Sequence, residues 1–283
     1  MMKKLILAIL IIQSFLAFSQ KSAKMYPEVK KDSVIYYADN IEIYPISITF
    51  EGQPELENLR IPGTFKTIQV LPPQSTKNKV ASFVVNDKKK GWKIKKMPIY
   101  YTLAGDATIK TYDSDYKYDL PFQKGKSFTV HQGYNGTFSH QNENSLDFTM
   151  PEGTKILAAR EGKVIDAVQS NNKGCPTVSC ANLANYISIL HSDGTIAQYF
   201  HLKQNGVKVK AGDIVKKGDI IGLSGNTGWT NGPHLHFVCF LPSPSSPKQR
   251  NTIKTLFRTG DGNKTEYLSE KKAYQNNTNY NIQ

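Results

Sequence analysis

The chain has 283 residues, with 36 basic against 23 acidic side chains and a formal net charge of +13. This length is sufficient for two domains, and the charge favours anionic partners. The lysines are scattered in small groups, such as residues 88–90 and 216–217. Since nucleic-acid binding typically uses a clustered basic surface, we predict no nucleic-acid partner.

Residues 1–19 have the features of a signal peptide. Two lysines precede an apolar stretch, residues 5–18, and Ala17-Phe18-Ser19 is a small-x-small pattern that permits cleavage before Gln20. The stretch is shorter than the roughly 20 apolar residues that span a bilayer. No later stretch is apolar enough, so we predict no stable membrane span after cleavage. The expected location is secreted or periplasmic, where a mature chain of charge +11 meets wall polymers or lipid head groups.

Residues 20–121 are predicted to form an N-terminal β module. Short runs rich in aromatic and β-branched residues alternate with turn residues, without a helical period. This spacing favours an immunoglobulin-like β-sandwich. The module contains no histidine, so we expect a spacer or wall-contacting role, with an unknown ligand. The expected strands are residues 33–37, 41–50, 66–71, 80–85, 92–95 and 98–103.

Residues 122–245 are predicted to form a second, antiparallel β domain that contains all six histidines of the chain. This segregation indicates where the chemistry lies. Residues 246–283 are expected to add a hairpin around Gly260 and a polar end, residues 275–283, whose composition is typical of disorder. The expected strands of the second domain are residues 156–159, 163–168, 185–190, 196–202 and 234–240. The fold is therefore predicted to be mainly β, and the oligomeric state is not predicted.

The three cysteines fall into two groups. Cys175 and Cys180 flank a four-residue loop and are a disulfide candidate, because export permits oxidation. The alternative is two free thiols. Cys239 lies on an expected strand and is predicted to be a small buried hydrophobic residue.

Two histidines in Gly232-Pro-His-Leu-His-Phe237 share one face of an expected strand. Successive side chains of a strand point to opposite faces, so His234 and His236 point the same way, about 7 Å apart. His140 and Asp147 offer a further histidine and a carboxylate. Two histidines and one aspartate make a three-ligand zinc site with an open position, the arrangement typical of catalytic zinc, which lowers the pKa of bound water to about 7.

Four sequence blocks occur in order between residues 122 and 240. They are Ser139-His140 to Asp147-Phe148 with Met150-Pro-Glu-Gly153 and Ala158-Ala-Arg-Glu-Gly-Lys-Val164; Gln198-Tyr-Phe-His-Leu202; residues 209–222; and Ser224-Gly-Asn-Thr-Gly228 running to Gly232-Pro-His-Leu-His-Phe237. This order resembles the lysostaphin-type, or LytM-like, zinc metalloendopeptidases. The resemblance implies an antiparallel β-sheet metallopeptidase domain with one zinc ion. It also implies peptidoglycan cross-links or stem peptides as substrates, with glycine-rich peptides as an alternative.

The resemblance also implies a role for each of five residues. His140, Asp147 and His236 resemble the zinc ligands, while His201 and His234 resemble the unliganded catalytic pair. His234 would take and return the proton of water, and His201 would hydrogen-bond the oxyanion.

Four other residues near these motifs need a separate interpretation. Glu143 is an alternative carboxylate, because the chain places six residues between histidine and aspartate where many members place three. Only Asp147 stands in the matching Leu-Asp-Phe-x-x-Pro context. His131 lacks a downstream carboxylate and is interpreted as structural or cleft-lining, and His191 as a turn residue. Trp229 stands where the family usually has a small polar residue, and it either shapes the substrate groove or packs.

Three other functions compete with a peptidase. Some LytM-like domains lack the metal residues and activate other wall hydrolases, but this chain has all five residues. Residues 207–222 resemble the hammerhead of biotinyl and lipoyl carriers, but no turn offers the lysine context that these carriers modify. An iron oxygenase fits two histidines and a carboxylate but not the export signal.

Overall fold

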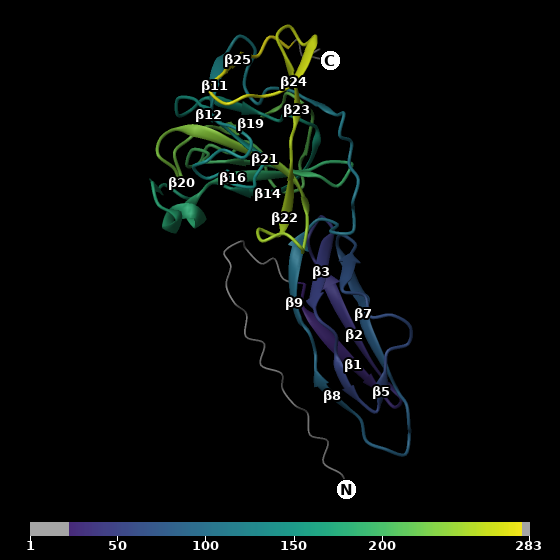
Figure 1. Ribbon diagram of the computed structural model, residues 1–283. Helices are drawn as coiled ribbons and strands as arrows, with labels where there is room; N and C mark the ends of the chain where they lie inside the picture. The colour runs from purple at the N-terminus through teal and green to yellow at the C-terminus, as the bar shows by residue number, and fades with distance from the viewer. Residues whose placement is uncertain (1–22, 279–283) are drawn as a thin grey trace.

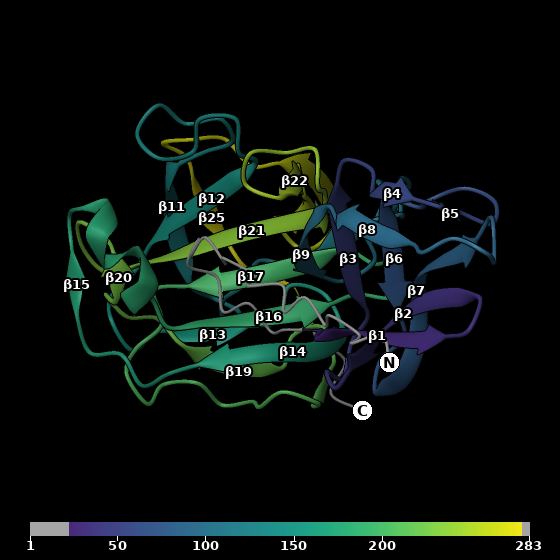
Figure 2. The same cartoon turned by 90° about the horizontal axis from the view of Figure 1, so that it is seen from below.

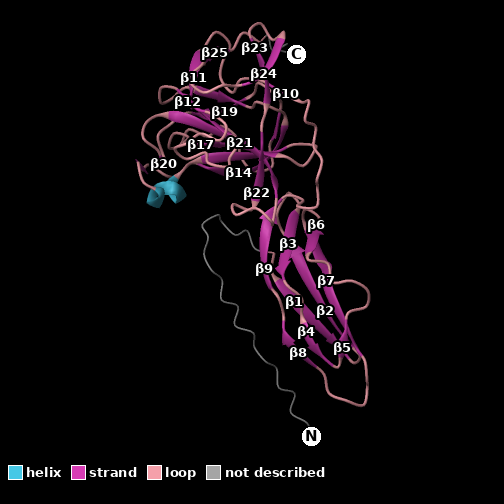
Figure 3. Ribbon diagram, viewed as in Figure 1, coloured by secondary structure: helices cyan, strands magenta, loops and turns pink. Residues whose placement is uncertain are grey.

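The computed structural model describes residues 23–278. The predicted signal peptide, residues 1–19, lies outside this range and stays a prediction. Within the described range no helix has both the length and the apolar character needed to cross a membrane. Almost all regular structure is β, and the helix of the described range is a short 3-10 helix beside β20, as Figure 3 shows. The prediction of a mainly β chain is therefore confirmed.

The N-terminal module consists of two packed sheets, drawn in purple and blue in Figure 1. One sheet has the order β1-β2-β7-β5 and the other β6-β3-β9, with β4 and β8 forming a separate pair. An immunoglobulin-like topology stays a prediction. The strands are β1 (Met25–Lys30), β2 (Ser33–Asn40), β3 (Ile46–Glu51), β4 (Glu55–Glu57), β5 (Leu59–Arg60), β6 (Ile68–Leu71), β7 (Ser75–Val85), β8 (Lys93–Lys96) and β9 (Ile99–Ala104).

Alternation along β2 explains the core of this module. Val34, Tyr36 and Ala38 are buried, and the residues between them are partly exposed. They pack with buried residues of β3 and β7, such as Ile48 and Phe83, in one apolar cluster. Burial of alternate side chains between two sheets is the pattern of a sandwich core.

The second region is built on a nine-stranded antiparallel sheet with the order β18-β14-β16-β17-β21-β12-β11-β25, to which β22 adds through β21. Figure 2 shows β14, β16, β17 and β21 side by side. Its elements are β10 (Lys117–Tyr118), β11 (Ser127–Gln132), β12 (Ser145–Thr149), β13 (Lys155–Leu157), β14 (Gly162–Val168), β15 (Gly174–Cys175), η1 (Val178–Leu183), β16 (Tyr186–Leu190), β17 (Ile196–Phe200), β18 (Ile214–Val215), β19 (Ile220–Leu223), β20 (Gly228–Trp229), β21 (His234–Pro242), β22 (Arg250–Ile253), β23 (Leu256–Thr259), β24 (Lys264–Tyr267) and β25 (Ala273–Gln275).

The two regions share a buried contact. Ile165 of β14 and Ile196 of β17 belong to the apolar cluster of the N-terminal module. Lys163 Nζ donates a hydrogen bond to the Ile43 carbonyl at 2.8 Å, and the Tyr101 hydroxyl donates one to the Pro244 carbonyl at 3.2 Å. The module therefore packs against the end of the large sheet.

The chain after residue 245 is part of the second region's fold. The expected hairpin is present, since β23 pairs with β24 in antiparallel fashion. The expected disorder from residue 275 is wrong for the described residues, because Gln275 ends β25, which pairs with β11, and Asn276 and Thr278 are buried. The prediction rested on polar composition, which is typical of disordered segments. Here a polar side chain is buried and ordered, because the Asn276 amide donates to the Phe122 carbonyl.

His191 begins the turn after β16, as predicted, and is fully enclosed. Its Nδ1 donates to the Glu161 carbonyl at 2.7 Å, while Nε2 has no hydrogen-bond partner among residues 23–278. Burial is the main reason that the pKa of His191 falls to about 4. The His191 ring is therefore unprotonated in the folded protein at neutral pH.

We expect this histidine to make the fold sensitive to acid. The unfolded chain binds the proton with a pKa of about 6.5, so stability is complete above that pH and is lost as the pH falls from 6.5 to 4. The loss is roughly 3 kcal/mol at pH 4. Urea unfolding of metal-free protein at pH 7 and pH 4 measures it. His191→Gln is expected to remove most of this pH dependence, and an unchanged dependence would show that other groups cause it.

Candidate metal centre

Strand pairing brings a histidine and a carboxylate face to face. His236 of β21 lies directly opposite Asp147 of β12 and opposite Phe200 of β17 on its other side. Leu235 and Phe237, which flank His236, point into the buried core. The alternating apolar residues therefore fix the strand and direct His236 to the other face of the sheet.

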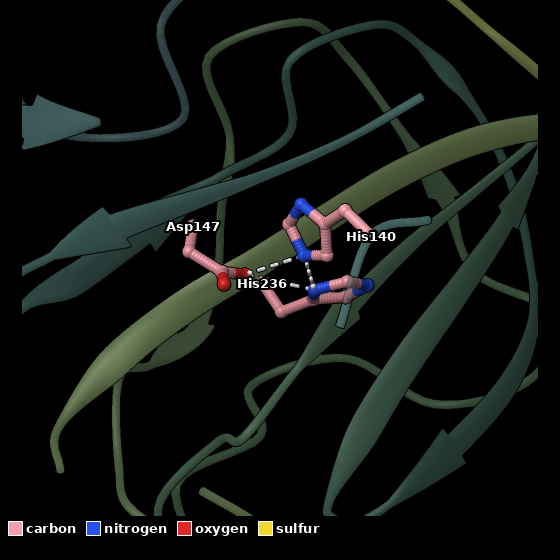
Figure 4. Close-up of side chains that lie close together, drawn as sticks. All are labelled: His140, Asp147 and His236. Atoms are coloured by element: carbon pink, nitrogen blue, oxygen red, sulfur yellow. Dashed lines mark hydrogen bonds and ion pairs between the residues drawn. The ribbon is translucent and has the colours of Figure 1, made fainter. Parts of the chain in front are cut away.

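A third side chain reaches this pair from the loop between β11 and β12. His140 Nε2 lies 3.2 Å from His236 Nδ1 and 3.3 Å from Asp147 Oδ1, and His236 Nδ1 lies 2.8 Å from the same carboxylate oxygen (Figure 4). His140 Nδ1 donates to the Gly133 carbonyl at 3.0 Å, which turns its Nε2 toward Asp147 and His236. The three side chains each offer one ligand atom, and these atoms lie within 4.8 Å of one another.

The charges of this cluster suit a cation. Burial works against ionisation of Asp147, but hydrogen bonds from His140 and His236 outweigh it and hold its pKa well below the usual value. Burial lowers the pKa of His236, so this ring is neutral at neutral pH. Burial also disfavours the charged form of His140, but the Asp147 carboxylate more than offsets it and raises the pKa of this ring. One carboxylate and two imidazoles are ligands that divalent transition metals prefer.

Gln132 supports this cluster, and the sequence did not reveal it. Its Nε2 donates to Asp147 Oδ2 at 3.0 Å and to Ser139 Oγ at 2.8 Å. Its Oε1 accepts hydrogen bonds from the backbone N–H groups of Phe138 and Ser139. One buried amide thus orients the carboxylate and holds the loop that carries His140. Only the pairing of β11 with β12 brings it to Asp147.

Gln132→Leu, which keeps the volume and removes the hydrogen bonds, is expected to weaken metal binding by about 10–100-fold, because outer contacts orient ligands. Competition for zinc against a chromophoric chelator measures the change. Gln204→Leu, an exposed glutamine on another loop, is the matched control and should bind normally. An affinity within twofold of the unchanged protein would mean that Asp147 needs no such support.

His201 and His234 form a second pair beside the three grouped side chains. Their ring centroids lie 4.4 Å apart, and His234 Nε2 lies 3.8 Å from Asp147 Oδ1. His201 Nδ1 donates to the Thr227 carbonyl at 2.7 Å, and His234 Nδ1 donates to the Gly232 carbonyl at 2.8 Å. In the tautomer that carries its proton on Nδ1, Nε2 of each ring is a proton acceptor.

The His201 backbone has a φ of 63°, a left-handed conformation that residues other than glycine rarely adopt. Such strain often marks functional positions. Burial, followed by the nearby His234 and His236, lowers the pKa of His201 to about 3. This ring is therefore neutral at neutral pH.

The structure separates the competing residues from the cluster. The Glu143 carboxylate pairs with Arg250 at 2.6 Å and with Lys248 at 3.2 Å, so its charge is already compensated. A bulge in β11 between Val130 and Gln132 leaves His131 exposed. Neither residue joins the group of ligand atoms.

The cysteines take two different environments. The structure joins Cys175 and Cys180 by a disulfide bond, which closes the loop that leads into η1. Cys239 is a buried free thiol whose sulfur lies 3.4 Å from the Tyr118 hydroxyl. It lies on the core side of β21, away from the histidines on the same strand.

An antiparallel β-sheet domain that groups two histidines and an aspartate is typical of a metallopeptidase, and comparisons with known proteins specify which family. Residues 141–243 match the family model described as "Peptidase family M23". The catalytic domain of the antimicrobial peptidase lysostaphin from Staphylococcus simulans is 32% identical, over 45% of this chain and 87% of that one, with a TM-score of 0.33. Residues 141–243 therefore form an M23 peptidase domain, and the predicted resemblance to lysostaphin-type enzymes is confirmed.

Two further relatives are endopeptidases by name. The glycyl-glycine endopeptidase ALE-1 of Staphylococcus capitis is 35% identical over 137 residues, which are 48% of this chain and 35% of that protein. The peptidoglycan DD-endopeptidase ShyA of Vibrio cholerae is 31% identical over 138 residues, 49% of this chain and 29% of that protein. The chain spans 27–35% of the length of such curated relatives.

Proposed function

We propose that the chain is an exported zinc metalloendopeptidase that hydrolyses peptide bonds in bacterial peptidoglycan. The observation that carries this proposal is the convergence of His140 Nε2, Asp147 Oδ1 and His236 Nδ1 beside the His201–His234 pair. Relatives named for glycyl-glycine and peptidoglycan cleavage support the substrate class. We further propose the predicted division into an N-terminal module and a catalytic domain, and a secreted or periplasmic location.

The donor set fits zinc. His140, Asp147 and His236 would hold the ion, because zinc in catalytic sites takes three nitrogen or oxygen ligands and leaves one position open. The Gly133 carbonyl and Gln132 fix the ring and the carboxylate, as outer contacts do in metal sites. When bound, zinc supplies a Lewis acid that polarises the peptide carbonyl and lowers the pKa of water.

The two remaining histidines would move the protons. Both rings enter the reaction with Nε2 as an acceptor, because both Nδ1–H groups are bound to backbone carbonyls. His234, which lies nearer to the Asp147 carboxylate, takes the proton of the attacking water and returns it to the leaving amine. His201 would donate to the oxyanion only after its Nε2 takes up a proton from solvent, and negative charge on the carbonyl oxygen favours this uptake.

Digestion of purified peptidoglycan, followed by mass spectrometry of the released fragments, tests the function. We expect new amino and carboxyl ends within the peptide cross-links or stems. Wall polymers with glycine bridges and without them identify the bond. If the protein binds zinc but produces no new ends, the substrate proposal is wrong, and the alternative of a silent module that activates other hydrolases gains support.

A further inference from the structure

Two aromatic side chains from separate loops meet in the second region. Phe138 and Trp229 have ring centroids 6.3 Å apart, with planes tilted by 45°. The Phe138 side chain is 62% exposed, although it is large and apolar, and Trp229 is partly exposed. Exposed apolar surface next to a candidate active site marks a place where a ligand packs.

Both aromatic residues are connected directly to the candidate metal centre. Phe138 lies two residues before His140, and its N–H donates to the Gln132 amide that also binds Asp147. Trp229 precedes Thr230, whose Oγ1 lies 3.4 Å from His234 Nδ1. The ring contact therefore joins the loop of a proposed metal ligand to the loop of a proposed catalytic histidine.

The disulfide loop holds Trp229 in place. β15 pairs with β20 in parallel, so Cys175 lies opposite Trp229, and the Thr230 N–H donates to the Cys175 carbonyl at 2.9 Å. The Cys175–Cys180 bond ties this strand to η1. Gly228 lets the backbone before Trp229 pack closely against Ala184. Its φ is +85°, and an added Cβ would lie 2.6 Å from the Ala184 Cβ. A side chain on a backbone fixed in this way has less conformational freedom to lose when a ligand binds.

We propose that Phe138 and Trp229 form an aromatic wall that makes the enzyme prefer peptides with a side chain beside the cleaved bond, such as alanine, over all-glycine peptides. This inference rests on the proposed function and names its specificity-determining residues. A methyl group packed on an aromatic face loses contact with water, and glycine offers no such group. One methylene or methyl group in an apolar site changes discrimination by about tenfold or more.

Tryptophan fluorescence tests the wall without catalysis. The chain has two tryptophans, so Trp92→Phe leaves Trp229 as the only reporter. We would titrate this zinc-loaded protein with blocked pentaglycine and with the same peptide carrying alanine at its central positions. The alanine peptide is expected to change the Trp229 emission and to reach half-saturation at about a tenfold lower concentration. Phe138→Ala should remove this difference.

Two further variants distinguish the wall from its surroundings. Val178→Ala changes an exposed apolar residue of the disulfide loop outside the ring contact, and it should alter neither titration. Cys175→Ser with Cys180→Ser should weaken alanine-peptide binding severalfold, because Trp229 loses its support. Equal binding of the two peptides, or no effect of Phe138→Ala, would overturn the inference.

Zinc content and peptidoglycan digestion are measured on the same protein to separate the two proposals. If peptidoglycan is cut but the two peptides bind equally, the proposed role of the aromatic wall is wrong and the proposed function stands. If the alanine peptide binds preferentially but nothing is cut, the wall stands as a peptide-binding surface and the proposed function is wrong.

Discussion

His236→Ala is expected to remove the metal and to lower peptide hydrolysis by at least about 10³-fold, because water without a Lewis acid has a pKa near 15.7 and is a poor nucleophile. His236 lies at the centre of the cluster, 2.8 Å from the Asp147 carboxylate and 3.2 Å from His140 Nε2. Its loss leaves one histidine and one carboxylate, which are too few for a stable catalytic zinc site. Elemental analysis and a peptide-release assay measure the two effects.

His131→Ala is the matched control, since His131 is an exposed histidine on β11 outside the cluster. It should retain one metal ion per chain and full activity. Retention of metal by His236→Ala, with activity within tenfold of the unchanged protein, would contradict the proposed ligand set.

His234→Ala and His201→Ala are expected to keep the metal and to lower the turnover rate by about 10²–10⁴-fold each, the usual contribution of a proton-transferring or oxyanion-stabilising group. Neither ring belongs to the group of three ligand atoms. Both present Nε2 as an acceptor, because backbone carbonyls hold their Nδ1–H groups. Metal content, turnover rate and KM are measured for each variant.

Two results would contradict the proposed roles of these histidines. Loss of metal in His234→Ala would make His234 a ligand, and unchanged turnover in His201→Ala would remove it from the mechanism. Circular dichroism is needed for His201→Ala, because this residue has a left-handed backbone and is buried. Because alanine tolerates this conformation poorly, His201→Asn is a second variant that distinguishes unfolding from loss of the imidazole.

The residues of the HxH motif could be placed from the sequence because strand alternation is local. The apolar residues Leu235 and Phe237 predict which face of β21 is buried, and His234 and His236 must then share the other face. The family resemblance added His140, Asp147 and His201, which no local pattern connects to that strand. Their grouping depends on the pairing of β12 and β17 with β21.

Other features could not be predicted because they depend on contacts between distant segments. Gln132 meets Asp147 only through the register of β11 and β12, and β25 reaches β11 from the other end of the chain. Phe138 and Trp229 lie 91 positions apart in the sequence and meet through ring contact. Their loops have no periodic pattern, so composition alone does not bring them together.

Titration of metal-depleted protein with zinc, with release of new amino ends from purified peptidoglycan as the readout, tests the central claim most directly. We predict no release without metal and a rise that reaches its plateau at one zinc ion per chain, because the structure groups one set of three ligand atoms within residues 23–278. Release that is unaffected by metal removal, or no release at one equivalent of zinc, would contradict a zinc-dependent peptidase centred on His140, Asp147 and His236.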